Sequence, residues 1–391
     1  MKITTFAYVF VIIMLVGGII GCERIEQVVQ PTAQPEGLSG EITIGVVLPQ
    51  TGHLGPGEFG PGALVMENSF NMALEEINTS QLLGDATLKF IIEDDMSTKE
   101  GAVTAFNKLI HQDRVPVILG VWTSHIAKSV FPIAQENQVV AFSPVVLASG
   151  LTAIGDFIFR TSLSTEVLIL EGVKVTQERL GYQRIATIAD TVDFASQVSD
   201  EVYRQTLTDN GVKVLTTETF VTGDTDFSNQ LTRIKTLNPD AIFVSAQDIE
   251  LIHILTQARE LGIPTEIPFI SLILSRDLIQ SAGAAAEGTI TFSAWISTAD
   301  TPRNQAFVQK YTEKYGFEPS VWAAKPYAAV YILAEAIRNA QSTGSEAIAA
   351  ALAEIKDFDT ILGKFSFDSN GDAIYDPVVL IVKNGKLEVF D

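Results

Sequence analysis

The chain has 391 residues, a formal net charge of −21 at neutral pH and a single cysteine. Its length is sufficient for two domains, because single hydrophobic cores stop growing at roughly 250–300 residues. The acidic excess, with no run of Lys and Arg, argues against nucleic-acid binding, since such a surface repels phosphates. One cysteine excludes an intramolecular disulfide and a metal site built from several thiolates. With 47% hydrophobic residues, the chain does not have the composition of a disordered protein.

The N-terminus has the features of an export signal that ends at the cysteine. Lys2 precedes an apolar stretch over residues 6–15, and small residues follow, up to Ile19-Ile20-Gly21-Cys22. These four residues resemble the bacterial lipoprotein box, whose cysteine receives diacylglycerol and becomes the mature N-terminus. The alternative is an uncleaved membrane anchor, for which the stretch is at the lower length limit. Either way, residues 1–22 place the chain outside the cytoplasm, and residues 23–40 form a tether.

From residue 41 onward, apolar runs of strand length alternate with segments of helical periodicity. The first series predicts strands at 42–48, 88–93, 115–119, 139–142 and 157–161, and helices at 63–78, 99–112 and 127–137. Continuous apolar runs are typical of parallel strands that are buried on both faces. Right-handed crossovers then give a parallel sheet covered by helices.

A second series repeats this alternation. It predicts helices at 164–180, 195–210, 228–237, 249–261 and 275–282, and strands at 184–189, 214–220, 241–245, 268–270 and 289–292. Helices at 302–315, 327–341 and 345–355 follow, and Asn384-Gly385 predicts a type I′ hairpin of strands 378–383 and 386–389. The fold class is therefore α/β, with two doubly wound parallel-sheet lobes. Ligands of such sheets bind at the carboxyl ends of the strands, so the cleft between the lobes is the expected site.

No motif indicates catalysis, a cofactor or a metal. The sequence GPGEFG at residues 55–60 matches G-x-G-x-x-G, but six residues separate it from the preceding strand, which favours a cleft loop over a dinucleotide site. Asp368, Asn370 and Asp372 begin like an EF-hand loop, yet Ala373 stands where Gly is required, which favours a simple turn. The histidines lack metal spacing, and no nucleophile has a base beside it. We therefore predict no enzyme activity, no cofactor and no metal site.

The segment after the strand at 115–119 is the local feature that suggests binding. Its sequence is Gly120-Val121-Trp122-Thr123-Ser124, directly before a predicted helix. Thr123 or Ser124 would present a hydroxyl and backbone N–H groups at a helix N-terminus, where an anion binds readily. A simple N-cap is the alternative, and the sequence leaves both open.

Several short strings resemble, in order and spacing, one family over residues 41–391. They include Ile44-Gly45-Val46-Val47-Leu48-Pro49, Ala73-Leu74-Glu75-Glu76-Ile77-Asn78, Val117-Ile118-Leu119-Gly120, Gly223-Asp224-Thr225-Asp226-Phe227-Ser228 and Gln257-Ala258-Arg259-Glu260-Leu261-Gly262. The resemblance is to the leucine/isoleucine/valine-binding family of bacterial ABC-transporter solute-binding proteins.

The resemblance implies the type I periplasmic-binding-protein fold, a clamshell of two lobes joined by three crossovers near Ser162, Phe292 and Asp368. Lobe 1 would comprise residues 41–162 and 293–367, and lobe 2 residues 163–292 and 368–391. It also implies an extracytoplasmic binding protein, which we expect to be a monomer, that delivers a small solute to an ABC permease. A sensing module that signals through a membrane partner is the alternative.

The resemblance further implies which residues bind the ligand. Ser124 matches a Ser or Thr that binds the ligand carboxylate, together with backbone N–H groups near Val145 and Leu147. Phe194 matches an aromatic residue that covers the ligand, and Trp322 lies near another. The complete predicted site is Trp122, Thr123, Ser124, Val145, Leu147, Phe194, Gln247, Asp248, Ser271 and Trp322.

Three positions depart from the amino-acid-binding members of the family. Leu147 stands where they have Thr, Thr165 stands near one acidic residue that holds the ligand ammonium, and Ser271 or Leu272 stands near another. Because a buried ammonium without a carboxylate is costly, we expect a small, largely apolar ligand with one carboxylate or amide-like end. Asp193 or Asp248 could restore the counter-charge, and branched-chain amino acids are the family default.

The lipobox predicts that Cys22→Ala leaves the precursor unlipidated. Two acyl chains bury many CH₂ groups, each worth about 0.8 kcal/mol, so the anchor of the native chain should be stable. Detergent phase partitioning and incorporation of a labelled fatty acid measure this directly. Equal partitioning and equal label in Cys22→Ala and the native chain would contradict the prediction.

Overall fold

The computed structural model describes residues 37–52, 62–272 and 274–390. The predicted signal peptide with Cys22, residues 23–36 of the tether and the glycine-rich sequence at residues 55–60 lie outside these ranges. Among the helices of the described residues, none has the length and hydropathy needed to cross a membrane. The described chain forms two large sheets and one small sheet.

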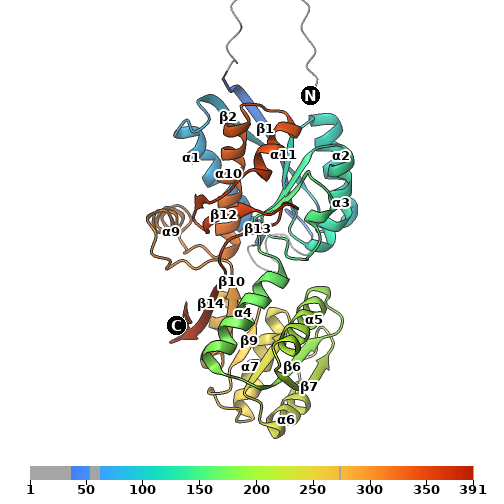
Figure 1. Ribbon diagram of the computed structural model, residues 1–391, viewed down its shortest axis with the longest axis vertical. Coiled ribbons are helices and arrows are strands. Elements are labelled where there is room, and N and C mark those ends of the chain that lie inside the picture. Colours follow the sequence, from blue (N-terminus) through green and yellow to red (C-terminus); the bar gives the residue numbers. More distant parts are fainter. Residues whose placement is uncertain (1–36, 53–61, 273, 391) are drawn as a thin grey trace, which may run out of the picture. The chain divides into compact units, whose positions relative to one another are not determined.

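The first large sheet has five parallel strands in the order β2-β1-β3-β4-β5. Its strands are β1 (Ser39–Leu48), β2 (Asp85–Asp94), β3 (Val117–Gly120), β4 (Val140–Ser143) and β5 (Ile158–Arg160). One face packs against α2 (Lys99–Lys108) and α3 (Ser124–Glu136), and the other against α1 (Gly62–Thr79) and α10 (Val321–Ala340) (Figure 1). Every residue of β3 and β4 is buried, and burial on both faces explains why all of them except Ser143 are apolar or glycine.

The second large sheet has seven strands in the order β15-β14-β10-β9-β8-β6-β7. Its parallel strands are β6 (Arg184–Asp190), β7 (Lys213–Phe220), β8 (Ala241–Ser245), β9 (Phe269–Ser271) and β10 (Ile290–Ser293), and its antiparallel strands are β14 (Val378–Lys383) and β15 (Lys386–Val389). The hairpin of β14 and β15 is confirmed, because Asn384 and Gly385 both have the positive φ angles that a type I′ turn requires.

Helices cover both faces of the second sheet as well. One face packs against α4 (Thr165–Leu180) and α5 (Phe194–Asp209). The other face packs against α6 (Ser228–Leu237), α7 (Asp248–Glu260) and α8 (Arg276–Ala282). The predicted class, α/β with doubly wound parallel sheets, is therefore confirmed.

The parallel strands of both sheets follow the same topological order. In the first sheet β1 lies between β2 and β3, and in the second β6 lies between β7 and β8. The chain winds away from this central strand in both directions, so the crossovers diverge beside it. Ligands of doubly wound sheets bind at the carboxyl ends of the strands at such a switch point. A ligand site is therefore expected at the segments that follow β1 and β3 and at those that follow β6 and β8.

Three crossings connect the two large sheets, after β5, after β10 and after β13 (Ala373–Ile374). The strand β13 belongs to a small antiparallel sheet with β11 (Phe358–Thr360) and β12 (Gly363–Phe367). Sequence analysis missed this sheet because two of its strands have only three and two residues. The one available signal was Phe365 and Phe367 in β12, two buried residues with the alternating spacing of a strand.

The predicted starts of two helices near the candidate site were wrong. The helix expected at residue 127 begins at Ser124, and the helix expected at residue 327 begins at Val321. Pro326 lies inside α10. So close to the helix N-terminus, proline removes a single backbone hydrogen bond, and the packing of the helix compensates for that loss. The longer α10 brings Trp322 into its first turn.

A buried ion pair holds the first and third crossings together. Arg160, the last residue of β5, has a fully buried side chain whose Nε donates to Oδ1 of Asp372 at 2.6 Å. Its Nη1 donates to the Ala148 carbonyl at 2.7 Å, and Thr152 Oγ1 donates to the same Asp372 oxygen at 2.6 Å. The backbone N–H of Asp372 in turn donates to Asp368 Oδ1 at 2.8 Å. The aspartates of the EF-hand-like sequence thus brace a turn against Arg160.

Asp372→Asn should lower the free energy of unfolding by about 3 kcal/mol, because it leaves the Arg160 guanidinium buried without an opposite charge. Urea unfolding followed by circular dichroism measures this. Asp359→Asn is the matched control: its ion pair with Arg303 is more than half exposed, so solvent screens it and little stability should be lost. Equal losses of unfolding free energy in the two variants would show that the Arg160–Asp372 pair stabilises the fold no more than the exposed pair does.

Candidate ligand-binding site

The backbone after β3 is bent by two consecutive residues with positive φ. Gly120 has a φ of +117°, and a Cβ at this position would lie 2.2 Å from the Val47 carbonyl oxygen of β1. Val121 has a φ of 51°, which is rare for a β-branched residue. The bend is held because the Val121 N–H donates to the Val47 carbonyl at 3.1 Å and Ser143 Oγ donates to the Val121 carbonyl at 3.2 Å. Such strained backbone concentrates at functional sites.

The bend leads directly into the N-terminus of α3. Thr123 is the N-cap, and its side chain accepts a hydrogen bond from the Ile126 N–H. Ser124 is the first helical residue, and its Oγ accepts from the N–H groups of Leu147 and Ala148 at 3.2 and 3.1 Å. The N-cap interpretation therefore applies to Thr123, which caps the helix. Its neighbour Ser124 instead hydrogen-bonds to the segment after β4.

This arrangement leaves the Ser124 hydroxyl proton available. Both hydrogen bonds to Ser124 Oγ use its lone pairs, and among the described residues none accepts from it. Ser124, Leu147 and Ala148 are all partly exposed. The Ser124 hydroxyl, positioned by these two N–H groups, therefore lies at the carboxyl ends of β3 and β4 with a proton that it can donate to an oxygen of a solute. Val145, by contrast, is buried, and its N–H faces Ser143 Oγ at 3.4 Å.

Two tryptophans from distant parts of the chain meet beside this segment. The rings of Trp122 and Trp322 have centroids 5.6 Å apart and an interplanar angle of 43°. Both rings are partly exposed. Sequence analysis selected both residues separately, and the structure brings them together because α10 begins at Val321. They supply an apolar wall next to the polar groups around Ser124.

Sequence analysis missed Lys325, which lies one turn along α10 from Trp322. Its side chain is 2% exposed, and its Nζ lies 4.1 Å from the centroid of the Trp322 ring. Burial lowers the pKa of Lys325 from 10.5 to about 7. The signal in the sequence was a single charged residue inside the apolar run AAKPYAAV.

The other predicted residues lie at the carboxyl ends of the second sheet. Phe194 begins α5, four residues after β6, and its side chain is 56% exposed. Asp193 caps α5 by accepting from the Ser196 N–H at 2.8 Å, and it also accepts from Gln247 Nε2 at 2.9 Å. The segments after β6 and β8 are therefore joined at the second switch point.

Asp248 and Ser271 complete this group. Asp248 begins α7, directly after Gln247, and its Oδ2 accepts from Ser275 Oγ at 2.8 Å. Ser271 is the last residue of β9 and is buried. The structure thus places the predicted residues in two groups, one at the carboxyl ends of β3 and β4 and one at those of β6, β8 and β9.

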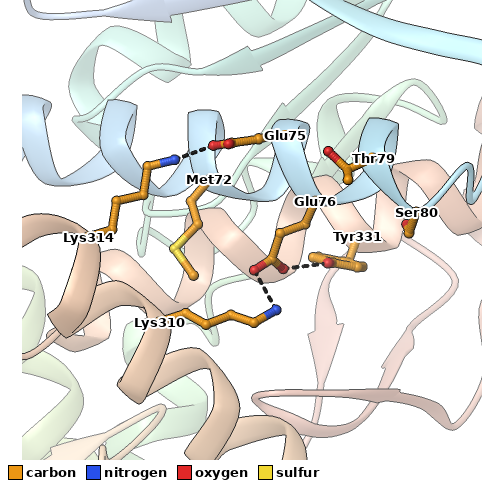
Figure 2. Close-up of a pocket in the computed structure, with 8 residues that line it drawn as sticks. All are labelled: Met72, Glu75, Glu76, Thr79, Ser80, Lys310, Lys314 and Tyr331. Carbon is orange, nitrogen blue, oxygen red and sulfur yellow. Dashed lines mark hydrogen bonds and ion pairs between the residues drawn. The ribbon is translucent and has the colours of Figure 1, made fainter.

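A surface pocket of about 470 Å³ lies away from both groups, where α1, α9 (Pro302–Tyr315) and α10 meet. Figure 2 shows Lys310 and Tyr331 directed at the carboxylate of Glu76, and Lys314 directed at Glu75. The acidic and basic groups that line it thus pair with one another, so the pocket offers little uncompensated charge to a ligand. We interpret it as the surface of a polar contact between helices.

Glu76 is the centre of that contact. Its carboxylate accepts from Lys310 Nζ and from the Tyr331 hydroxyl, both at 2.8 Å, and from the Tyr327 hydroxyl. Burial raises the pKa of Glu76, but these hydrogen bonds outweigh burial and hold the pKa below its ordinary value of 4.5. The ionised carboxylate therefore stabilises the packing of α1 against α9 and α10.

Within the described ranges, no group of three or more His, Cys, Asp or Glu side chains could hold a metal ion. The arrangement of the candidate residues supports binding: a hydroxyl, backbone N–H groups and aromatic rings lie where doubly wound sheets bind ligands.

Comparison with known proteins agrees with this geometry. The sequence profile of the family described as periplasmic binding protein matches residues 41–386. The chain belongs to this family. It is 26% identical over 302 residues to a leucine-, isoleucine-, valine-, threonine- and alanine-binding protein of Pseudomonas aeruginosa, which spans 77% of this chain and 80% of that protein.

Two solved structures of the periplasmic binding protein family support the same assignment. A leucine-binding protein of Thermotoga maritima has 29% identity and a TM-score of 0.78, over 90% of this chain and 98% of that one. A branched-chain amino acid transporter substrate-binding protein of Streptococcus pneumoniae, solved with isoleucine, has 26% identity and a TM-score of 0.77, over 89% and 98%. The chain therefore has the type I periplasmic-binding-protein fold, and it is similar to Leu/Ile/Val-binding proteins of ABC transport.

Glu76→Gln should destabilise this periplasmic binding protein in a pH-dependent way. Because the pKa of Glu76 is lowered on folding, its contribution is present above pH 4.5 and is lost as the pH falls through the folded-state pKa. The variant should lose about 1–2 kcal/mol at pH 7, and this difference should shrink as the pH falls through the lowered folded-state pKa. Denaturant unfolding at several pH values measures this. Glu75→Gln, at a more exposed pair, is the control, and a pH-independent loss would contradict the role of the charge.

Proposed function

We propose that this protein binds a small carboxylate-bearing solute, an amino acid or a related organic acid, in the cleft between its lobes. Lobe 1 comprises residues 41–162 and 293–374, and lobe 2 residues 163–292 and 375–391, because β13 pairs with β12 and the third crossing follows it. The loaded protein then presents the solute to an ABC permease. It acts as a monomer without catalytic activity, tethered outside the cytoplasm through lipid on Cys22.

The observation that carries this proposal is the geometry around Ser124. Its hydroxyl retains a proton for donation, and it lies against the N–H groups of Leu147 and Ala148 at the N-terminus of α3. A hydroxyl donor at a helix N-terminus is well suited to a carboxylate, since the helix dipole also favours negative charge there. A carboxylate oxygen that approaches Ser124 can accept from the hydroxyl directly.

Apolar surface near the same strand ends supports a solute with an apolar body. Trp122 and Trp322 form a wall beside Ser124. At the carboxyl ends of the second sheet, Val192, Phe194 and Ile249 are each more than half exposed. Exposed large apolar side chains that gather around one end of a sheet indicate a surface that becomes covered on binding. Closure of the two lobes on a solute would bury them.

The names of the relatives support the same solute class. The Thermotoga and Streptococcus proteins are a leucine-binding protein and a protein solved with isoleucine. Both ligands combine a carboxylate with a branched apolar side chain. In this chain, however, Leu147, Thr165 and Leu272 offer no carboxylate for an ammonium group. A deaminated acid is therefore as good a candidate as a zwitterionic amino acid.

Ser124→Ala should weaken binding of a carboxylate solute by roughly 1.5–3 kcal/mol, the usual worth of a hydrogen bond to a charged group. Isothermal titration calorimetry with leucine and with 4-methylpentanoate, its deaminated analogue, measures the change. Thermal unfolding of the unliganded variant separates this effect from loss of fold.

Ser129→Ala is the matched control for Ser124→Ala. Ser129 lies on the same helix, and its Oγ donates only to the His125 carbonyl, at 3.4 Å. It should therefore bind both compounds as the native chain does. If Ser124→Ala bound with native affinity, the carboxylate site would have to lie elsewhere. If the native chain bound neither compound, that would count against this solute class.

A further inference from the structure

Lys325 is a buried amine for which the described residues supply no opposite charge. It belongs to a stretch of α10 in which residues 323–330 are all buried. Among the described residues, no carboxylate lies within 4.0 Å of its Nζ, and no carbonyl or hydroxyl accepts from it. Within the part of the chain that the structure describes, the face of the Trp322 ring is what compensates the ammonium. A cation–π contact offsets part of the cost of removing an ammonium from water, but it does not replace an ion pair.

Two independent contacts place Lys325 beside the groups that bind the solute. Its ammonium lies over Trp322, and the Trp322 ring packs against Trp122, two residues before Ser124. In addition, Thr161 Oγ1 lies 3.4 Å from both the Lys325 carbonyl and the Pro144 carbonyl. Pro144 directly follows β4. The turn of α10 that carries Lys325 therefore lies against the carboxyl ends of both β3 and β4.

We propose that the Lys325 ammonium binds the carboxylate of a solute that carries no ammonium group, with the apolar body of that solute against Trp122 and Trp322. This inference rests on the proposed function and specifies its solute class. The carboxylate supplies the missing opposite charge, and the Ser124 hydroxyl adds a hydrogen bond to it.

Charge balance selects an acid over an amino acid. One carboxylate offsets the charge of one buried lysine, whereas Asp193 and Asp248 of the second group already accept from Ser196, Gln247 and Ser275. A zwitterion would bring an ammonium as well, and Leu147, Thr165 and Leu272 cannot accept from it as carboxylates would. Relative to the amino-acid-binding relatives, Thr165 and Leu272 remove negative charge from the site. The buried lysine adds positive charge, so both differences favour an anionic solute.

The test compares acids with their own amides. Calorimetry on the full chain uses 4-methylpentanoate, phenylacetate, the amides of both, and leucine. For at least one of the two acids, the native chain should bind the acid more tightly than its amide. Lys325→Met should weaken binding of that acid on the order of 10- to 100-fold and leave the amide unchanged, because only the acid uses the charge. The variant keeps the length of the side chain under Trp322, and thermal unfolding checks that it folds.

Lys128→Met, which removes an exposed lysine of α3, controls for the change in net charge and should bind like the native chain. Native affinity for the acids in Lys325→Met, or equal losses for acid and amide, would overturn the role of the charge. Binding of leucine but of neither acid would overturn the solute class while leaving the solute-binding function intact. No binding of any of these compounds would count against both.

Discussion

The constraint on which this structure depends is the geometry of parallel strand pairing. A strand parallel to its neighbour is reached only through a crossover, and right-handed crossovers lay helices over both faces of the sheet. Solvent and solute then reach the sheet only at its ends. Both sheets have the order in which the first strand is central, so each has one switch point where the crossovers diverge. The candidate residues follow strands at or next to these points.

Close contact between β1 and the end of β3 sets the local geometry of the first group. Because a Cβ at Gly120 would collide with the Val47 carbonyl, only glycine fits this approach. The chain then turns through Val121 in a left-handed conformation, held at both its N–H and its carbonyl. As a result Trp122 packs against Trp322 instead of continuing the strand, and Ser124 reaches the segment after β4. A backbone constraint thus positions both the apolar wall and the hydroxyl.

Two buried cations of the first lobe illustrate two different uses of charge. Arg160 is neutralised by Asp372 and donates to a backbone carbonyl, so its charge stabilises the contact between two crossings. Lys325 is equally buried, yet the described residues give it only the face of Trp322. A protein tolerates an uncompensated buried charge where a ligand completes it, because removing charge from water is otherwise too costly. The difference in partners therefore separates a structural cation from a binding one.

The sequence by itself determined the alternation of strands and helices, since period and run length are local properties, and the ranges of α6, β8, α9 and the terminal hairpin match their predictions. It also singled out Trp122, Ser124 and Trp322. Only the tertiary structure decided which of these meet, because Trp122 and Trp322 are two hundred positions apart in the chain and are joined by packing of α10. It alone identified Lys325, because a sequence shows that a lysine is present but not whether any carboxylate folds against it.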